Sequence, residues 1–181
     1  MQLSAASTVE EVAAVVSDAL TSAGITAVLS GGAAVQIYTG GLYESRDLDF
    51  VASASQRDLE RVLQRFGFLR QAGRHFVHET CPYTLEFPPW PLAVGNDLVR
   101  TWGEQSVGDL RIQILTPTQC VMDRLAAFYH WRDRQALDQA ALVGSLHSVD
   151  IDEIERWSAR EGQSAAYKEF AVRLKATRIC D

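Results

Sequence analysis

Apolar residues near the N-terminus recur at intervals of three and four positions, which is the spacing of one face of a helix. They are Val12, Val15, Val16, Ala19 and Leu20. A capping-box pattern over residues 8–11 precedes them and Gly24 follows them, so we predict an amphipathic helix between these signals. The short apolar run 25–29 stops at Gly31-Gly32 and predicts a buried strand, and residues 33–39 predict a short helix after it.

Residues 47–51 alternate between polar and apolar, which predicts a strand with one face toward a core. A second capping-box pattern at Ser55 opens a helix that Gly67 ends. Three more strands are predicted at 74–79, 83–87 and 109–115. The segment 88–108 gives no clear pattern, and we predict a loop with at most one edge strand there.

The chain changes character at Thr116-Pro117, an N-cap followed by a proline at the first helical position. From there to about residue 175 the pattern predicts three or four helices, with breaks near Arg134, at 145–150 and near Gly162. We therefore expect an α/β (α+β) fold with a mixed sheet and flanking helices over residues 1–115, followed by a C-terminal helical subdomain over 116–181.

The composition is that of an ordinary globular protein and narrows the functional classes. Of the 181 residues, 47% are hydrophobic, which excludes a disordered or collagen-like chain, and the net charge of −6 argues against a general nucleic-acid coat. Apolar runs fall well short of the roughly 20 residues of a membrane span, and residues 1–7 do not resemble an export signal. We expect a soluble cytoplasmic protein that binds no membrane. Three separated cysteines, Cys81, Cys120 and Cys180, are expected to be structural thiols.

The segment Ser30-Gly31-Gly32 joins a predicted strand to a predicted helix. Glycines at such a turn let backbone N–H groups approach a ligand closely, and the helix N-terminus carries a partial positive charge. A phosphate group is favoured at this position. We therefore predict that Ser30, Gly31 and Gly32 hold a phosphate group.

Asp47 and Asp49 lie two positions apart on one strand, so both carboxylates leave the same face. Carboxylates held this close repel one another unless a cation lies between them, and Mg²⁺ is commonly bound by one or two carboxylates together with substrate phosphates. Glu86, between two apolar residues on a later strand, is our third candidate ligand, with Glu79 or Asp109 as the next choice. These residues predict a catalytic Mg²⁺ (or Mn²⁺) site.

The order of these motifs resembles the nucleotidyltransferase superfamily with the polymerase-beta-like fold. The match rests on residues 29–32, on residues 45–50 and on 85–87 as the third element. The layout of a minimal catalytic domain and a helical tail looks like the AbiEii and MenT type of small bacterial proteins. The resemblance implies an NTP substrate, and it adds Ser45, Arg46 and Arg124 to the predicted nucleotide-binding residues.

The chain also departs from the AbiEii-like pattern. Tyr43 stands where these proteins often have an arginine, and the tail has Arg124 and Arg132-Asp133 where they commonly carry lysine and a Lys-Asp pair. Arginine still neutralises phosphate charge but presents a planar fork rather than a point charge. The departures bear more on toxin-like activity than on nucleotide binding.

We therefore expect a metal-dependent nucleotidyltransferase that moves an NMP from an NTP to a hydroxyl acceptor, with an RNA end, a protein or a small molecule such as an aminoglycoside all open as acceptors. A role in a toxin–antitoxin pair, with a cognate antitoxin as partner, is implied by the resemblance alone. The alternative is a catalytically inactive protein of this fold that binds a nucleotide or a partner protein. Trp131 and Trp157 occupy apolar positions of the tail, and we expect both in the core rather than as platforms for base stacking.

Overall fold

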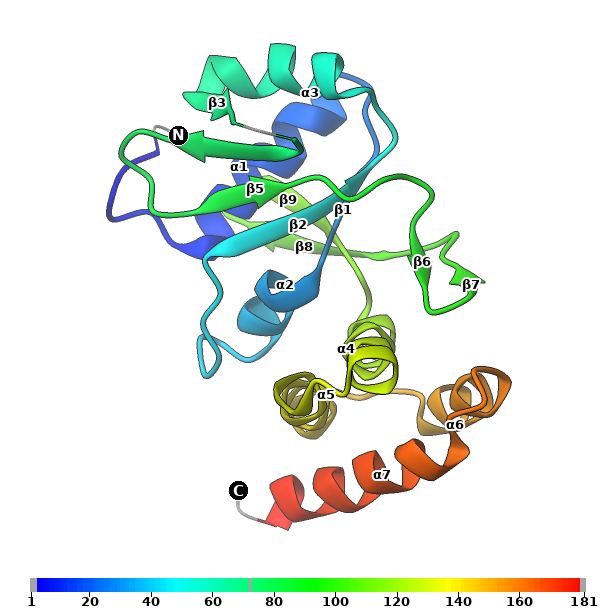
Figure 1. Ribbon diagram of the computed structural model, residues 1–181. Coiled ribbons are helices and arrows are strands. Elements are labelled where there is room, and N and C mark those ends of the chain that lie inside the picture. The colour runs from blue at the N-terminus through cyan, green and yellow to red at the C-terminus, as the bar shows by residue number, and fades with distance from the viewer. Residues whose placement is uncertain (1–2, 72, 180–181) are drawn as a thin grey trace.

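In the computed structural model, which describes residues 3–71 and 73–179, seven strands form one mixed sheet in the order β3-β4-β5-β2-β1-β9-β8 (Figure 1). They are β1 (Ala27–Ser30), β2 (Asp47–Ala52), β3 (Phe68–Arg70), β4 (His75–His78), β5 (Thr84–Glu86), β8 (Gly103–Val107) and β9 (Leu110–Ile114). Neighbouring strands β1 and β2 run antiparallel, whereas β2 is parallel to β5 and β1 is parallel to β9. Cys180 lies outside the described residues, so its predicted role stays untested.

The helices of the α/β part begin and end close to where the sequence signals predict. They are α1 (Val9–Ser22), α2 (Gly31–Tyr38) and α3 (Gln56–Leu63), the last continued by a 3₁₀ turn to Phe66 before Gly67. Thr8 and Glu11 form the predicted capping box of α1, and α1 packs behind the sheet against β1 and β9 (Figure 1). Helix α2 begins at Gly31, two residues earlier than predicted, so its N-terminus lies directly at the end of β1.

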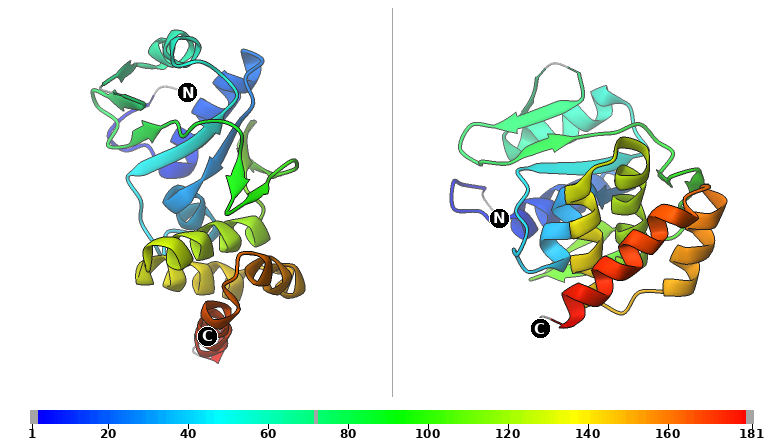
Figure 2. Two further views of the ribbon diagram at one scale, coloured as in Figure 1. Left: turned by 45° about the vertical axis from the view of Figure 1, so that its right-hand side comes forward. Right: turned by 60° about the horizontal axis from the view of Figure 1, so that its bottom comes forward.

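Four helices form the C-terminal tail, as predicted: α4 (Pro117–Trp131), α5 (Arg134–Leu146), α6 (Ile151–Arg160) and α7 (Ser164–Ile179). Helices α4 and α5 pack against α2, and α6 and α7 lie on their far side (Figure 2). The hydroxyl of Tyr38 donates a 2.6 Å hydrogen bond to the carbonyl of Leu115, and Nε2 of His147 donates one of 2.6 Å to the carbonyl of Tyr38. One hydrophobic cluster contains residues of both parts, and the tail packs against both α2 and β6.

Two strands and one hairpin were missed by the sequence patterns. Strand β3 follows Gly67, β8 pairs along its whole length with β9, and β6 (Ala93–Val94) and β7 (Asp97–Leu98) form a short hairpin beside the sheet. The segment 103–107 reads Gly-Glu-Gln-Ser-Val and is an edge strand, whose polar side chains carry no apolar alternation. The segment 88–108 therefore contains three short strands, β6, β7 and β8, where we predicted at most one. Within the described ranges, every helix is too short or too polar to cross a bilayer.

Candidate nucleotide-binding and catalytic site

The turn from β1 into α2 brings the backbone against a carboxylate. Gly31 has a φ of +68°, and a Cβ built on it would clash with Oδ2 of Asp49. Both the backbone conformation and the lack of space therefore require a glycine at this position. A Cβ on Gly32 would lie 3.0 Å from Oγ of Ser45. The predicted residues Ser30, Gly31, Gly32 and Ser45 are therefore neighbours around the first turn of α2.

The N-terminus of α2 differs from those of five other helices. Thr8, Ser55, Thr116, Asp133 and Asp150 each accept a hydrogen bond from a backbone N–H in the first turn of their own helix. In contrast, among the described residues the Ser30 side chain makes no such bond, and its hydroxyl donates instead to the carbonyl of Asp49, 3.3 Å away. The first N–H groups of α2 are consequently available to a ligand with acceptor oxygens.

The three candidate carboxylates lie on adjacent strands with matched register. Asp49 pairs with Ser30 on one side and with Glu86 on the other. Leu48 and Phe50 are fully buried, as the alternation predicted, so Asp47 and Asp49 leave the opposite face of β2 together. Asp47 is exposed, Asp49 is partly buried, and the Glu86 side chain is 39% exposed. This register favours Glu86 over the alternatives Glu79 and Asp109, which are exposed outside the β2–β5 pair.

The pKa of Asp49 is raised by its burial and by the acidic side chains around it. Burial, followed by the negative charges of Glu86, Asp123 and Asp47 and opposed by Arg124, raises the pKa of Asp49 to about 6. A carboxylate in this environment is held near other negative charge without enough positive charge to balance it. A cation bound beside it would remove that imbalance.

Helix α4 supplies the opposite wall of the site through Asp123 and Arg124. Nε and Nη2 of Arg124 both donate to Oδ2 of Asp123, over 2.9 and 2.6 Å, and the two side chains are 18% and 21% exposed. Burial acts to lower the pKa of Arg124, but Asp123 and the other neighbouring acids raise it on balance. Arg124 thus stays charged close to Asp49.

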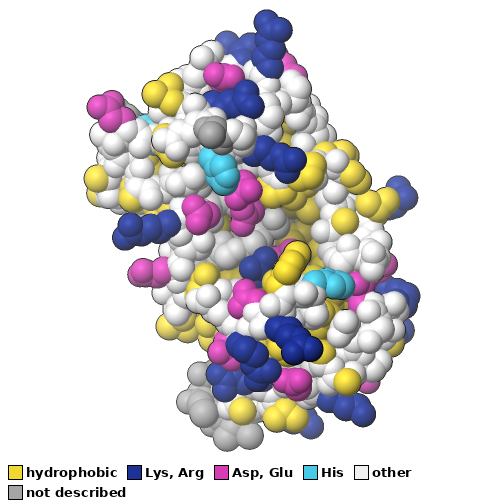
Figure 3. All heavy atoms as spheres, in the orientation of Figure 1, with side chains coloured by type: hydrophobic (Ala, Val, Ile, Leu, Met, Phe, Trp, Pro, Cys, Tyr) yellow, Lys and Arg dark blue, Asp and Glu magenta, His cyan; other side chains and the backbone are white. Residues whose placement is uncertain are grey.

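A pocket of about 430 Å³ joins these elements. One of its walls is formed by Ser30, Gly31 and Asp49, and the others come from the β6–β7 hairpin and from one face of α4. Figure 3 shows this hollow between the sheet and the tail, with acidic side chains and hydrophobic surface at its margins. A pocket of this size is suited to a small organic ligand.

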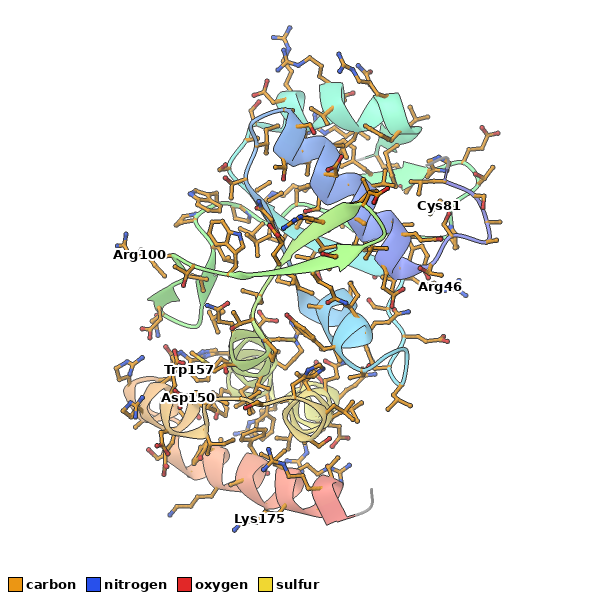
Figure 4. The ribbon with its side chains drawn as sticks, turned by 180° about the vertical axis from the view of Figure 1, so that it is seen from behind. Arg46, Cys81, Arg100, Asp150, Trp157 and Lys175 are labelled. Carbon is orange, nitrogen blue, oxygen red and sulfur yellow. The ribbon has the colours of Figure 1, made fainter. Side chains whose placement is uncertain are left out.

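Some predicted residues lie apart from this pocket. Arg46 is exposed at the start of β2 and projects from the edge of the molecule (Figure 4), and it is not among the residues that line the pocket. Across residues 3–71 and 73–179, the arrangement of His, Cys, Asp and Glu provides no group of three that could hold an ion by itself. The donor chemistry nevertheless suits Mg²⁺, which usually takes one or two carboxylates and completes its shell with water and substrate phosphates.

Three residues of α4 that line the pocket were not placed in the site by the sequence: Asp123 and His130 were given no role, and Trp131 was expected in the core. Asp123, His130 and Trp131 lie on the same face as Arg124, a relation that the seven-residue spacings 123–130 and 124–131 could have indicated. Trp157 is fully buried against Tyr129, as expected, and is labelled in Figure 4. Trp131 is 77% exposed, so the expectation that it belongs to the core is wrong: it occupies the last position of α4, where the chain turns away through Arg132.

No protein-family model matches the chain, and no curated protein matches it. The chain is similar in fold to the solution structure of the antibiotic-resistance factor ANT(2'')-Ia, an aminoglycoside nucleotidyltransferase, with a TM-score of 0.52 over 92% of this chain and 94% of that one. The two sequences are 12% identical. At that identity the likeness bears on the fold, and the mixed sheet with flanking helices and helical tail is a nucleotidyltransferase-like fold.

Proposed function

We propose that this protein is a metal-dependent nucleotidyltransferase that moves a nucleoside monophosphate from an NTP to a hydroxyl acceptor. One observation carries the proposal: the uncapped N-terminus of α2 lies directly beside Asp49, which pairs in register with Glu86. The phosphate-binding turn and Asp49 thereby share one pocket, and Asp47 and Glu86 lie beside Asp49 on β2 and β5 without lining that pocket. The likeness in fold to ANT(2'')-Ia supports nucleotidyl transfer in general.

In this proposal the triphosphate lies against the first turn of α2. The N–H groups beyond Ser30 donate to phosphate oxygens, and Gly31 and Gly32 leave room for that approach. Ser45 supports Gly32 from the other side, and its hydroxyl donates to the carbonyl of Asp47 over 3.0 Å. Arg124 faces the same space and balances phosphate charge.

Asp47, Asp49 and Glu86 are the residues that would hold Mg²⁺ or Mn²⁺, together with the phosphates. The ion supplies neutralisation of the charge that develops on the transferring phosphoryl group. Asp49 is closest to the phosphate-binding turn, and Glu86, on the neighbouring strand, helps to activate the acceptor hydroxyl. In the reaction the acceptor oxygen bonds to the α-phosphorus, the bond from that phosphorus to the β-phosphate oxygen breaks, pyrophosphate leaves, and the hydroxyl proton passes to a carboxylate or to water.

The acceptor is open between an RNA end, a protein and a small molecule. The resemblance to AbiEii and MenT proteins supports a cognate antitoxin as partner. The likeness to an antibiotic-resistance factor supports an aminoglycoside. Incubation of the protein with α-³²P-labelled NTP and, separately, with purified RNA, cell protein and an aminoglycoside panel identifies the class that becomes labelled.

The triphosphate site itself is tested by thermal unfolding with each NTP, with and without Mg²⁺. Ligand at about a hundred times its dissociation constant adds about 2.7 kcal/mol to the free energy of unfolding, which corresponds to about 5 to 10 °C for a chain of this length. We expect the shift only when metal is present. Absence of a metal-dependent shift at millimolar NTP contradicts the proposal, whereas a shift without any labelled product favours the inactive, nucleotide-binding alternative.

A further inference from the structure

Trp131 lines the pocket from the last turn of α4. Its side chain is 77% exposed, whereas tryptophan is on average a well-buried residue. An isolated exposed apolar residue needs no explanation. This one, however, lines the same pocket as Gly31 and Asp49, and it lies two helical turns beyond Arg124, whose charge acts on Asp49.

The spacing along α4 places a gap between Arg124 and Trp131. These residues are seven positions apart, which is two helical turns, so they share a face and lie about 10 Å apart along the helix axis. Ala127 lies between them on that face and contributes only a methyl group. The large side chains of Arg124 and Trp131 thus bound a space that only the small, apolar side chain of Ala127 lines between them. A distance of this order also separates the phosphates from the base in an extended nucleoside triphosphate.

The wall facing α4 is held in place by a buried acid. The Glu161 carboxylate, in a side chain only 2% exposed, accepts hydrogen bonds of 2.8 and 3.0 Å from the backbone N–H and side-chain amide of Asn96, which lines the pocket on the β6–β7 hairpin. Nε2 of His130 lies 3.5 Å from the same carboxylate. Leu92, just before the hairpin, gives this wall an apolar surface. The pocket is therefore formed before any ligand enters, which lowers the entropic cost of binding.

We propose that the space between Arg124 and Trp131 is the site for the nucleobase of the NTP, with the base stacked on the Trp131 ring. The inference rests on the proposed function, because it places the triphosphate of the same molecule at Gly31 and Asp49. Every base has a flat π-face, so an aromatic ring accepts all four of them, and the larger purines gain the most contact.

The test compares a ligand that has a base with one that does not. Isothermal titration calorimetry with Mg²⁺ measures the affinity for ATP and for inorganic tripolyphosphate. Stacking of one base typically contributes enough that its loss weakens binding about tenfold or more. We expect Trp131→Ala to weaken the affinity for ATP to that extent and to leave the affinity for tripolyphosphate unchanged. Trp131→Phe should keep most of the affinity for ATP. Trp90→Ala, which removes a tryptophan outside this pocket, is the matched control and should leave both affinities unchanged.

A second variant fills the space without removing the ring. Ala127→Leu extends a partly exposed side chain into the pocket, so we expect a folded protein that loses ATP affinity and keeps tripolyphosphate affinity. If Trp131→Ala changes the affinities for ATP and tripolyphosphate equally, or changes neither, the proposed nucleobase site is wrong while the triphosphate site stands. Trp131 then contacts the acceptor or neither substrate. If the wild-type protein binds neither ligand, the proposed function and this inference fail together.

Discussion

Replacement of Asp49 by asparagine should stabilise the protein while it abolishes transfer. The carboxylate is partly buried beside Glu86 and faces Asp123, and burial with these like charges raises its pKa from 3.8 to about 6. In the absence of metal and nucleotide, the ionised form is therefore a cost to the folded state. Asparagine has nearly the same shape and carries no charge, so it removes that cost.

The magnitude and its pH dependence follow from the same pKa. The folded protein binds more protons than the unfolded chain between pH values of about 4 and 6, so the destabilisation is absent below the unfolded pKa and complete above the folded one. A tenfold change in an acid constant corresponds to about 1.4 kcal/mol, which gives about 3 kcal/mol at pH 8 as an upper limit. About half of this amount remains at pH 5.

Urea unfolding followed by circular dichroism at pH 8 and pH 5, without metal or nucleotide, measures this difference. We expect Asp49→Asn to gain stability at pH 8 and to gain distinctly less at pH 5. Asp47→Asn is the matched control, because Asp47 is exposed on the same strand face and its replacement should change stability by no more than about 0.5 kcal/mol at either pH. A loss of stability for Asp49→Asn at pH 8, or the same gain at both pH values, refutes the electrostatic reasoning. Normal transfer by both variants refutes the catalytic role of the acids.

Three further predictions test the strand register, the turn and the third acid. Leu48→Asp places an unpaired carboxylate in the core and should cost several kcal/mol, seen as a large fall in melting temperature, whatever the function. Gly31→Ala should destabilise the protein by more than Gly24→Ala. Both glycines have a positive φ, but only at Gly31 does the added Cβ meet a carboxylate. Equal losses of stability in urea unfolding would show that backbone strain alone matters. Glu86→Gln should reduce the rate of nucleotide transfer by at least about tenfold and Glu79→Gln should not, and equal rates for the two variants in the labelling assay would remove Glu86 from the site.

The sequence determined those parts of the protein that depend on residues near one another in the chain. The capping boxes at Thr8 and Thr116 fix where α1 and α4 begin, and Gly67 ends the turn that follows α3. Alternation over 47–51 determined which side chains of β2 enter the core, because the two faces of a strand alternate strictly. The separation of Asp47 and Asp49 from Leu48 was therefore predictable from five consecutive residues.

Only the tertiary structure decided what lies beside those acids. The pairing of Asp49 with Glu86 depends on the register between strands 37 residues apart, and many registers satisfy the same apolar pattern. Edge strand β8 has largely polar side chains and therefore shows no apolar alternation. Its identity as a strand depends on its backbone pairing with β9. Local patterns therefore cannot supply either feature.

The face of α4 that lines the pocket likewise depends partly on the sequence and partly on the tertiary structure. Helical spacing places Arg124 and Trp131 on one face, but burial alone decides whether that face meets a core or a cavity. The packing of α4 and α5 against α2 and the anchoring of the β6–β7 hairpin by Glu161 leave this face open at Trp131. These contacts join segments more than 60 residues apart, and their geometry depends on how whole elements pack rather than on any local sequence signal.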